Sequence, residues 1–369
     1  MNSGRFESDK IAIVIPTLNP SGKILQLIRD IREMIGCPLI VVNDGSRQEC
    51  SGIFEQLKKS GLADLTVLEH AVNLGKGRAL KTAFNYFLLN YPDGVGVVTC
   101  DGDGQHAPED IRACAESLLR HPAVLTLGVR DFSAENVPFK SRFGNKLTVA
   151  VFKSYGLSIS DTQTGLRGIP SDTMKMLMNV RGERFEYETE MLISCHDRHV
   201  GFVEVPINTV YIDDNAETHF NPIVDSAKIY AVIFRHLSKR LLKFGLSGIV
   251  SAGVDISIFY LLFHHAFAGA MHGRLFWSVL ISRALSLCVN YSLNLNFVFR
   301  RGGESGSFWS ARSFAKYLAL CVVVMLISYS LTKMGNICFP DQEIVVIKIL
   351  SDIIAFLVSF YVQQVVVFK

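Results

Sequence analysis

Two carboxylates one residue apart are the residues of this chain best suited to chemistry. Asp101 and Asp103 follow a short apolar run, Val95 to Cys100, in the stretch Asp101-Gly102-Asp103-Gly104-Gln105-His106. Alternate residues of a strand point to opposite faces, so both carboxylates reach one ion only where the strand ends and turns, as glycine allows. A magnesium or manganese ion held by one or two carboxylates usually completes its shell with substrate phosphates and water.

A surface turn rich in Asp and Gly is the common alternative for such a pair, so the surrounding sequence has to decide. A calcium-binding EF-hand loop is excluded, because His106 replaces the glycine and Arg112 the glutamate that this loop requires.

The first 211 residues alternate short apolar runs with longer segments of helical spacing. This alternation predicts an α/β fold around a mostly parallel sheet. The expected strands are Ile11 to Ile15, Leu39 to Val42, Leu65 to Leu68, Val95 to Val98 and Val124 to Leu127.

Polar residues follow the first two expected strands. The loops past the carboxyl ends of parallel strands form the ligand crevice of such folds, which places Thr17, Asn19 and Asp44 where a nucleotide could bind. Asp44 could accept hydrogen bonds from a base or ribose, or it could stabilise a turn before the next helix.

A glycine-rich turn, Asn73-Leu74-Gly75-Lys76-Gly77-Arg78, opens the helical segment after the third strand. Its amides and two cations suit a phosphate. It has neither the third glycine of a dinucleotide-binding motif nor the Lys-Ser/Thr pair of a P-loop, so NAD binding and ATPase activity are not indicated.

Taken together, these motifs resemble glycosyltransferase family two, in particular the polyprenol-phosphate mannose and glucose synthases. They run in the family's order over nearly all of the segment from Ile11 to Thr209. The matching pieces are Pro16 to Asn19, Val42 to Ser46, Asn73 to Gly77, Asp101 to His106, Asp161 to Arg167 and Phe185 to Glu190.

The resemblance implies a GT-A (Rossmann-like) glycosyltransferase domain, a nucleotide-sugar donor, and Mg²⁺ or Mn²⁺ held by Asp101, Asp103 and Gln105. It implies that Arg167 holds a phosphate. Pro20 replaces the usual glutamate, and His219 is the nearest substitute for a missing lysine of the mannose synthases. The expected donor-binding residues are Pro16, Thr17, Asn19, Asp44, Asn73, Lys76, Asp101, Gly102, Asp103, Arg167 and His219.

A lipid phosphate would be a suitable acceptor. Its second pKa is about 6, so its oxygen is already an anionic nucleophile at pH 7, and positioning cations matter more than a strong base. Arg130 resembles the family arginine that meets phosphate, and Arg142 lies on a basic, aromatic-edged helical face that could instead be an ordinary surface helix. The resemblance gives Asp161 the task of orienting the acceptor or the sugar, and Glu188 or Glu190 could face the site. The expected catalytic residues are Asp103, Asp161, Arg130 and Arg142.

The C-terminal part is apolar enough for a bilayer. Four stretches, about 244–268, 275–299, 317–337 and 344–368, are each long enough to span it, which predicts an all-α transmembrane domain after a domain of residues 1–221. The amphipathic segment 222–243 is expected to lie on the membrane surface. This part resembles the GtrA-like family of four-helix proteins, which is associated with moving lipid-linked sugars across membranes.

Charges predict the orientation of the four spans. Basic clusters stand before the first span, between the second and third, and after the last. The positive-inside rule therefore places both termini and the catalytic domain in the cytoplasm, at the plasma membrane, and no secretory signal precedes Ile11. Eight cysteines without C-x-x-C spacing indicate neither a zinc site nor a disulfide framework.

Two further features mark the membrane half. Residues 289–300 resemble residues 358–369, which suggests two helical hairpins in tandem. Four charged residues fall within the expected spans and must face one another or water. They are Asp255 with Arg283 across the first hairpin, and Lys348 with Asp352 one helical turn apart, and they either pair structurally or line a path for lipid-linked sugars.

The sequence therefore predicts a membrane enzyme that transfers one sugar, with inversion, from a nucleotide sugar to polyprenyl phosphate. A processive synthase is disfavoured, because its Gln-x-x-Arg-Trp motif is missing and both tryptophans, Trp277 and Trp309, lie in the membrane half. The alternative is a transporter, flippase or assembly scaffold with a nucleotide-sugar-binding domain. The expected partners are a nucleotide sugar, polyprenyl phosphate and membrane lipids, with no nucleic acid, and homo-oligomerisation is left open.

Overall fold

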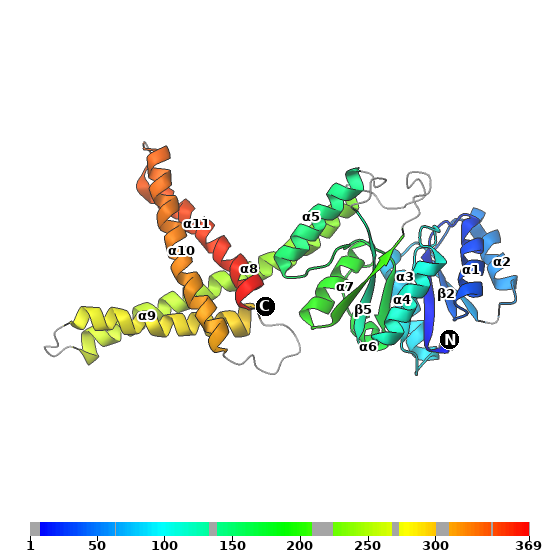
Figure 1. Cartoon of the computed structure of the whole chain (residues 1–369), viewed down its shortest axis with the longest axis horizontal. Coiled ribbons are helices and arrows are strands. Elements are labelled where there is room, and N and C mark those ends of the chain that lie inside the picture. Colours follow the sequence, from blue (N-terminus) through cyan, green and yellow to red (C-terminus); the bar gives the residue numbers. More distant parts are fainter. Residues whose placement is uncertain are drawn as a thin grey trace, which may run out of the picture. The chain divides into compact units, whose positions relative to one another are not determined.

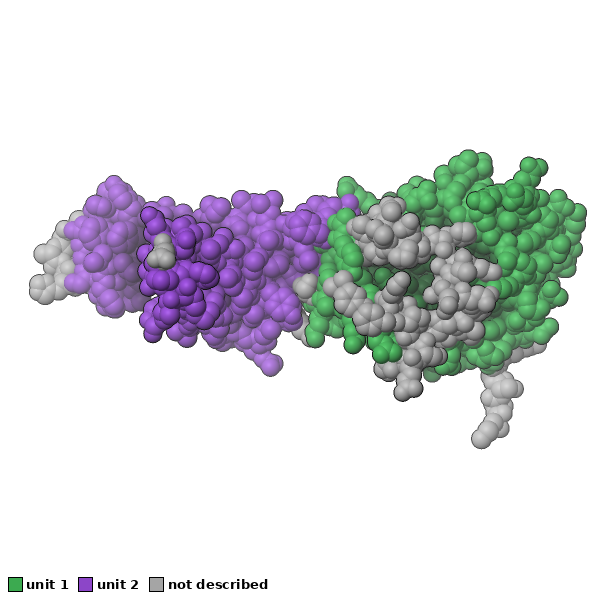
Figure 2. Space-filling view, turned by 90° about the horizontal axis from the view of Figure 1, so that it is seen from above, with its two compact units in different colours: residues 1–153, 157–233 green, residues 154–156, 234–369 purple. Residues whose placement is uncertain are grey.

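The computed structural model describes residues 8–62, 64–132, 139–208, 224–267, 273–299, 310–340 and 342–368. The chain forms two compact units (Figure 2), one of residues 1–153 and 157–233 and the other of residues 154–156 and 234–369. The first unit contains the β-sheet and the second contains the long apolar helices (Figure 1).

The described part of the first unit has one sheet, in the strand order β3-β2-β1-β4-β6-β5-β7. β6 runs antiparallel to β4 and β5, and the other neighbours are parallel. The predicted α/β fold is thus confirmed, as are the five strands read from apolar runs. The strands are β1 Ile11–Thr17, β2 Leu39–Asn43, β3 Leu65–Glu69, β4 Gly96–Thr99, β5 Val124–Arg130, β6 Arg167–Pro170 and β7 Gly201–Ile207.

Helices cover both faces of this sheet. α1 (Lys23–Met34), α2 (Ser51–Lys59) and α4 (Pro108–Arg120) share one apolar core with alternate residues of the central strands, such as Ile13 and Val41. α3 (Lys76–Asn90) packs on the opposite face, against β1 and β2, and contacts α6 (Ser171–Leu177) and α7 (Glu186–Asp197). α5 (Phe139–Tyr155) follows β5. The result is a three-layered α/β/α unit.

The strand directions bring several loops together at one edge of the sheet. β1, β2 and β4 are parallel, so their carboxyl ends at Thr17, Asn43 and Thr99 meet there. β6 is antiparallel and begins at Arg167, opposite Thr99, so the loop before it reaches the same edge. Loops from four strands therefore surround one site.

The described part of the second unit contains four long helices, as predicted. Among the described residues, four segments are long and apolar enough to cross a membrane, namely Tyr230–Ala266, Arg274–Val298, Ala311–Cys338 and Ile344–Val367. The helices are α8 Val224–Leu261, α9 Arg274–Leu293, α10 Ala311–Cys338 and α11 Ile344–Val362, and π-helical turns follow as η4 Leu262–Ala266, η5 Asn294–Val298 and η6 Gln363–Val367. α8 is one helix over most of the predicted surface segment and of the first predicted span.

The four helices form two hairpins, α8 with α9 and α10 with α11, and equivalent residues of the two hairpins contact each other reciprocally. Asn294 and Gln363, which are 69 residues apart and begin the matching turns η5 and η6, hydrogen-bond to each other at 2.9 Å. The Tyr291 ring lies 5.5 Å from that of Phe368, and the equivalent pair Phe299 and Phe360 lies at 5.8 Å. This exchange of equivalent partners indicates an internal pseudo-twofold repeat, which agrees with the similarity of residues 289–300 to residues 358–369.

Candidate active site

Asp101 is the centre of a charged cluster at the carboxyl edge of the sheet. Lys76, the first residue of α3, places Nζ 2.7 Å from Asp101 Oδ1 and 3.1 Å from Oε1 of Glu188 in the first turn of α7. His106 Nε2 lies 3.5 Å from Asp101 Oδ2. Burial acts to lower the pKa of Lys76, but the charges of Asp101 and Glu188 hold that pKa above its ordinary value. Lys76 therefore remains a cation in this cluster.

The two carboxylates of the Asp-Gly-Asp stretch differ in their proton affinity. Burial acts to raise the pKa of Asp101, yet Lys76 and His106 hold it below the ordinary value. Burial and then the negative charge of Asp101 raise the pKa of Asp103. Asp103 thus carries an electrostatic cost that a bound cation would relieve.

The donor set fits a hard divalent cation. In the described parts of the chain, no cluster of three or more His, Cys, Asp or Glu residues could hold a metal ion. A metal here would rely on Asp101, Asp103 and the amide oxygen of Gln105, whose backbone N–H also donates to Asp103 Oδ1 at 3.0 Å. Few protein ligands and substrate phosphates are what Mg²⁺ prefers, whereas zinc prefers nitrogen and sulfur.

Gly165 explains how the loop before β6 approaches Asp101. A Cβ atom added to Gly165 would lie 2.4 Å from Asp101 Oδ2, so a side chain at this position would displace the carboxylate. The hydroxyl of Thr99 donates to the Gly165 carbonyl at 2.8 Å and fixes the loop. A Cβ atom added to Gly102 would likewise lie close to Thr17, at 3.2 Å from its hydroxyl oxygen.

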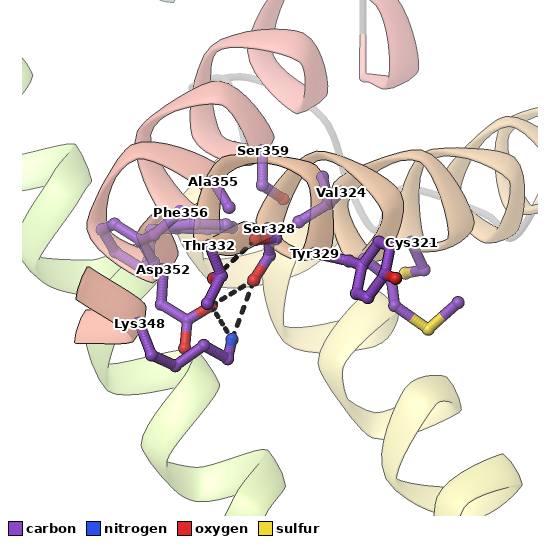
Figure 3. A pocket seen from close by; sticks show the side chains of 12 residues that line it. Cys321, Val324, Ser328, Tyr329, Thr332, Lys348, Asp352, Ala355, Phe356 and Ser359 are labelled. Atoms are coloured by element: carbon purple, nitrogen blue, oxygen red, sulfur yellow. Dashed lines mark hydrogen bonds and ion pairs between the residues drawn. The ribbon is translucent and has the colours of Figure 1, made fainter. Parts of the chain in front are cut away.

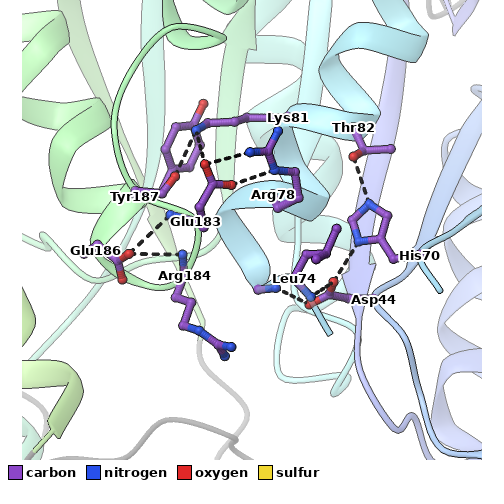
Figure 4. A network of polar contacts seen from close by, with 12 residues as sticks. Asp44, His70, Leu74, Arg78, Lys81, Thr82, Glu183, Arg184, Glu186 and Tyr187 are labelled. Carbon is purple, nitrogen blue, oxygen red and sulfur yellow. Dashed lines mark hydrogen bonds and ion pairs between the residues drawn. The ribbon is translucent and has the colours of Figure 1, made fainter. Parts of the chain in front are cut away.

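Asp44 organises the loop that precedes α3 (Figure 4). Its Oδ1 and Oδ2 accept the backbone N–H groups of Leu74 and Gly75 at 2.9 and 2.8 Å. His70 bridges Asp44 Oδ1 at 2.7 Å to the hydroxyl of Thr82 at 2.9 Å. Asp44 thus stabilises the loop before α3, which lies about 30 residues further along the chain and places Lys76; neither the local turn nor a nucleotide contact is tested by these bonds.

A second network fastens the start of α3 to the start of α7 (Figure 4). Arg78 Nε lies 2.7 Å from Glu183 Oε2, and buried Lys81 donates to the Gly182 carbonyl at 2.9 Å. The Lys81 ammonium also lies 4.8 Å from the ring centre of Tyr187. Because α3 carries Lys76 and α7 carries Glu188, these contacts hold the two ends of that ion pair together.

Arg130 and Asp161 form a bidentate pair. Arg130 Nε and Nη2 lie 2.6 and 3.1 Å from the two carboxylate oxygens of Asp161. Asp161 is fully buried, whereas the Arg130 side chain is 24% exposed. The structure therefore shows Asp161 orienting an arginine. A direct contact of Asp161 with the acceptor or sugar, as first expected, would require this pair to open.

Arg167 is not positioned to hold a phosphate, as the family resemblance implied. It begins β6, is only 1% exposed, and donates from Nε to the Thr164 carbonyl and from Nη1 to the Glu188 carbonyl, both at 2.9 Å. A guanidinium committed to main-chain carbonyls inside the fold is not available to a phosphate, which corrects the expectation. Arg167 instead fixes the loop next to Asp101 and the first turn of α7.

The structure places most of the remaining predicted residues in or beside the elements already described. Asn19 adopts a positive φ of 49°, and its backbone N–H donates to the Ser46 hydroxyl at 2.8 Å. Pro16 and Thr17 end β1, and Asn73 accepts a hydrogen bond from Arg184 at 3.4 Å. Arg142 is half-buried on α5. His219 lies outside the described residues.

The sequence assigned no role to two contributors to the cluster, His106 beside Asp101 and Gly165 against Asp101. It left Glu188 and Glu190 as alternatives, and the structure places Glu188 next to Lys76. His106 could have been found from its place in the Asp-Gly-Asp stretch. The contact of Glu188 with Lys76 leaves no local signal, because the two residues meet only through the packing of α3 on α7.

Comparison with known families agrees with this geometry. Residues 12–179 match the model of glycosyl transferase family 2, and residues 243–368 match that of the GtrA/DPMS transmembrane domain. The chain thus combines a family 2 glycosyltransferase domain with a GtrA/DPMS transmembrane domain. The predicted enzyme class, GT-A-type domain and membrane domain are thereby confirmed.

Several relatives match the glycosyltransferase part. The chain is 27% identical to an uncharacterized protein of Methanocaldococcus jannaschii, over 63% of this chain and 94% of that protein. It is 25% identical to UDP-N-acetylglucosamine–dolichyl-phosphate N-acetylglucosaminyltransferase of Methanococcus voltae, over 63% and 98%. It is 24% identical to dolichyl-phosphate beta-glucosyltransferase of Saccharomyces cerevisiae, over 55% and 67%.

Proposed function

We propose that this glycosyltransferase transfers a single sugar from a UDP- or GDP-sugar to polyprenyl phosphate, with inversion, and so makes a polyprenyl-phosphate sugar. The observation that carries the proposal is the charged cluster of Asp101, Asp103 and Lys76 at the edge of the sheet where ligands of this fold class bind. The names of two relatives, which act on dolichyl phosphate, support a lipid-phosphate acceptor.

On the donor side, the chain offers carboxylates for a metal and a lysine for a phosphate. Asp101, Asp103 and Gln105 would hold Mg²⁺ or Mn²⁺, which would neutralise the charge of the departing diphosphate. Lys76 is anchored by Glu188 on one side, so its bond to Asp101 can be exchanged for a bond to a donor phosphate. The site thus keeps its positive charge next to the leaving group.

On the acceptor side, Arg130 and Arg142 are the proposed phosphate-binding cations. Asp161 holds the Arg130 guanidinium through Nε and Nη2, which would fix the orientation of a cation that meets the phosphate. The acceptor oxygen is anionic at pH 7 and attacks the anomeric carbon as the bond to the diphosphate breaks. One displacement at this carbon inverts its configuration.

The charge distribution supports an orientation in the plasma membrane. Basic residues flank the cytoplasmic ends expected for the spans, among them Lys239, Lys243 and Lys316. With both termini and the catalytic unit in the cytoplasm, the active site would have access to soluble nucleotide sugars and to polyprenyl phosphate of the cytoplasmic leaflet.

The test is a transfer assay on purified full-length protein. Undecaprenyl phosphate is incubated with radiolabelled UDP- and GDP-sugars and with Mg²⁺ or Mn²⁺, and label in the organic phase is counted. One donor should give a labelled lipid, and chelation with EDTA should abolish it. Absence of labelled lipid with every donor, together with nucleotide-sugar binding, would favour the alternative of a transporter or scaffold with a nucleotide-sugar-binding domain.

A further inference from the structure

The two hairpins of the membrane unit are joined by hydrogen-bonded polar side chains. The Ser247 hydroxyl donates to Asn294 Oδ1 at 2.6 Å, and Asn290 donates to the Ser251 hydroxyl at 3.0 Å. The Tyr317 hydroxyl, from the other hairpin, donates to Asn290 Oδ1 at 2.8 Å. We call these residues, with Gln363, the polar seam.

The charged residues of the spans extend this seam along the same helix faces. Asp255 stands one helical turn beyond Ser251 and pairs with Arg283 at 3.2 Å. In the second hairpin, Ser328 donates to Asp352 at 2.6 Å and accepts a hydrogen bond from Lys348 at 2.8 Å, and Lys348 also pairs with Asp352. Each hairpin therefore has one ion pair further along the helices that carry the polar seam.

The ion pair of the second hairpin is not covered by the helices themselves. The side chains of Lys348 and Asp352 are 49% and 53% exposed. Asp352 lies eight residues after the start of α11 at Ile344, which places it about 12 Å along a helix that crosses roughly 30 Å of hydrocarbon. Exposed charges at that depth are costly against lipid tails, so a polar group must cover them.

A cavity adjoins this pair (Figure 3). Its volume is about 670 Å³, and it lies against α10 and α11, with Phe244 of α8 also in its wall. Its wall combines hydrogen-bonding groups with aromatic rings. The residues used in the argument are Ser328, Thr332, Lys348, Asp352, Tyr329 and Phe356.

We propose that this cavity binds the sugar ring of a polyprenyl-phosphate sugar, an inference that rests on the proposed function. A carboxylate, an ammonium and hydroxyls within one small area can each bond to sugar hydroxyls, while aromatic rings such as Tyr329 can pack on the apolar face of the ring. The ion pair is neutral as a whole, which suits an uncharged polyhydroxylated ring better than a phosphate. A ligand at this depth must reach the cavity from the bilayer, as a lipid-linked sugar can.

The test uses photo-crosslinking of the full-length protein in lipid nanodiscs. The probes are farnesyl-phosphate sugars of glucose, mannose and N-acetylglucosamine with a diazirine on the first isoprene unit, and the same farnesyl phosphate without a sugar. Labelled peptides are identified by mass spectrometry. At least one sugar probe should label α10 and α11 around the cavity roughly tenfold more than the sugar-free probe.

A double variant, Lys348→Met with Asp352→Leu, removes both charges together, because removing one alone would leave the other uncompensated. It should lose the sugar-selective labelling, whereas Lys333→Met, which removes an exposed charge of α10 outside the cavity lining, should retain it. Transfer to a short, water-soluble prenyl phosphate is measured on the same preparations. It should be unchanged in both variants, since neither alters the active site.

Three outcomes would overturn the inference. Equal labelling by the sugar-free probe would assign the cavity to a lipid phosphate, and labelling unaffected by the double variant would place the sugar elsewhere. Cross-links between two chains through this face, formed by an added bifunctional reagent, would show that a second copy covers the ion pair. Failure of the proposed function is recognised separately, because wild-type protein would then not transfer sugar to the short acceptor.

Discussion

Lys76 lies between Asp101 and Glu188, so replacing it should change both metal binding at Asp101 and binding of the donor. A cation 2.7 Å from Asp101 opposes the binding of a metal ion to that carboxylate. We therefore predict that Lys76→Met binds Mn²⁺ more tightly in the absence of nucleotide, by roughly fivefold, equivalent to about 1 kcal/mol. At the same time its kcat/KM for the donor should fall by at least about tenfold.

Electron paramagnetic resonance of free Mn²⁺ gives the affinity, and Lys58→Met is the matched control, since Lys58 forms an exposed ion pair with Glu69 on the surface. Unchanged Mn²⁺ affinity in Lys76→Met would show that the metal does not use Asp101.

A variant of Asp103 tests directly whether this carboxylate is a metal ligand. Replacing Asp103 by Asn removes one anionic ligand from a site with few protein ligands, so transfer should fall more than about a hundredfold. The fold should remain intact, as judged by circular dichroism and Tm. The exposed Asp93→Asn serves as control and should keep full activity. Near wild-type activity of Asp103→Asn with added Mg²⁺ or Mn²⁺ contradicts the assignment.

Arg130 and Asp161 are expected to act as one unit towards the acceptor. Arg130→Ala should raise the KM for lipid phosphate far more than that for the nucleotide sugar, because it removes a charge-assisted contact worth about 1.5–3 kcal/mol. Asp161→Asn should raise the same KM by misorienting Arg130, and the double variant should be little worse than Arg130→Ala. Steady-state kinetics with both substrates varied measures this. A rise in the donor KM instead would move the pair to the diphosphate site.

At the scale of elements, the loop before β6 has to pass very close to Asp101. We predict that Gly165→Ala lowers transfer by at least about tenfold while most of the stability is kept, because the new Cβ would lie 2.4 Å from Asp101 Oδ2 and push the carboxylate away. Gly52→Ala, in α2 with nothing within 4 Å of the added Cβ, should leave activity unchanged and slightly raise Tm. Equal activity of the two variants would show that this close approach does not matter.

The elements differ in how far the sequence reveals them. β1, β2 and β4 are continuous apolar runs buried in the middle of the sheet, so their residues alone indicate strands. β6 has only four residues and begins with a buried arginine, and its antiparallel direction depends on pairing with β4 and β5. The residues of β6 alone therefore do not indicate a strand, and the family resemblance, which implied a phosphate contact for Arg167, does not reveal its burial.

The same limit applies to the site. Asp101 and Asp103 could be recognised because their spacing is local. The Arg78–Glu183 contact that fastens α3 to α7 joins residues 105 apart in sequence, and only the packed structure brings them together. In the membrane half, length and hydropathy were enough to predict the four spans. The hydrogen bond between Asn294 and Gln363 could not be predicted, because it depends on how the two hairpins pack.

At the scale of the whole molecule, the membrane unit is expected to supply the acceptor to the catalytic unit. A variant ending at Asn221 should keep transfer to a short, water-soluble prenyl phosphate but lose most of it to long-chain polyprenyl phosphate, because the anchor provides a high effective concentration of a lipid confined to the bilayer. Equal loss on both acceptors, with the fold verified by circular dichroism, would show that residues beyond 221 help to build the active site.

The central claim is that the enzyme adds one sugar to a lipid phosphate, and the mass of the lipid product tests it most directly. Full-length protein is incubated with undecaprenyl phosphate, Mg²⁺ or Mn²⁺ and each nucleotide sugar, and the extracted lipids are analysed by mass spectrometry. We predict a product heavier than the acceptor by a single sugar residue, formed by the wild type and not by Asp103→Asn. A ladder of several sugars, an added sugar phosphate, or no glycosylated lipid with any donor would contradict the account.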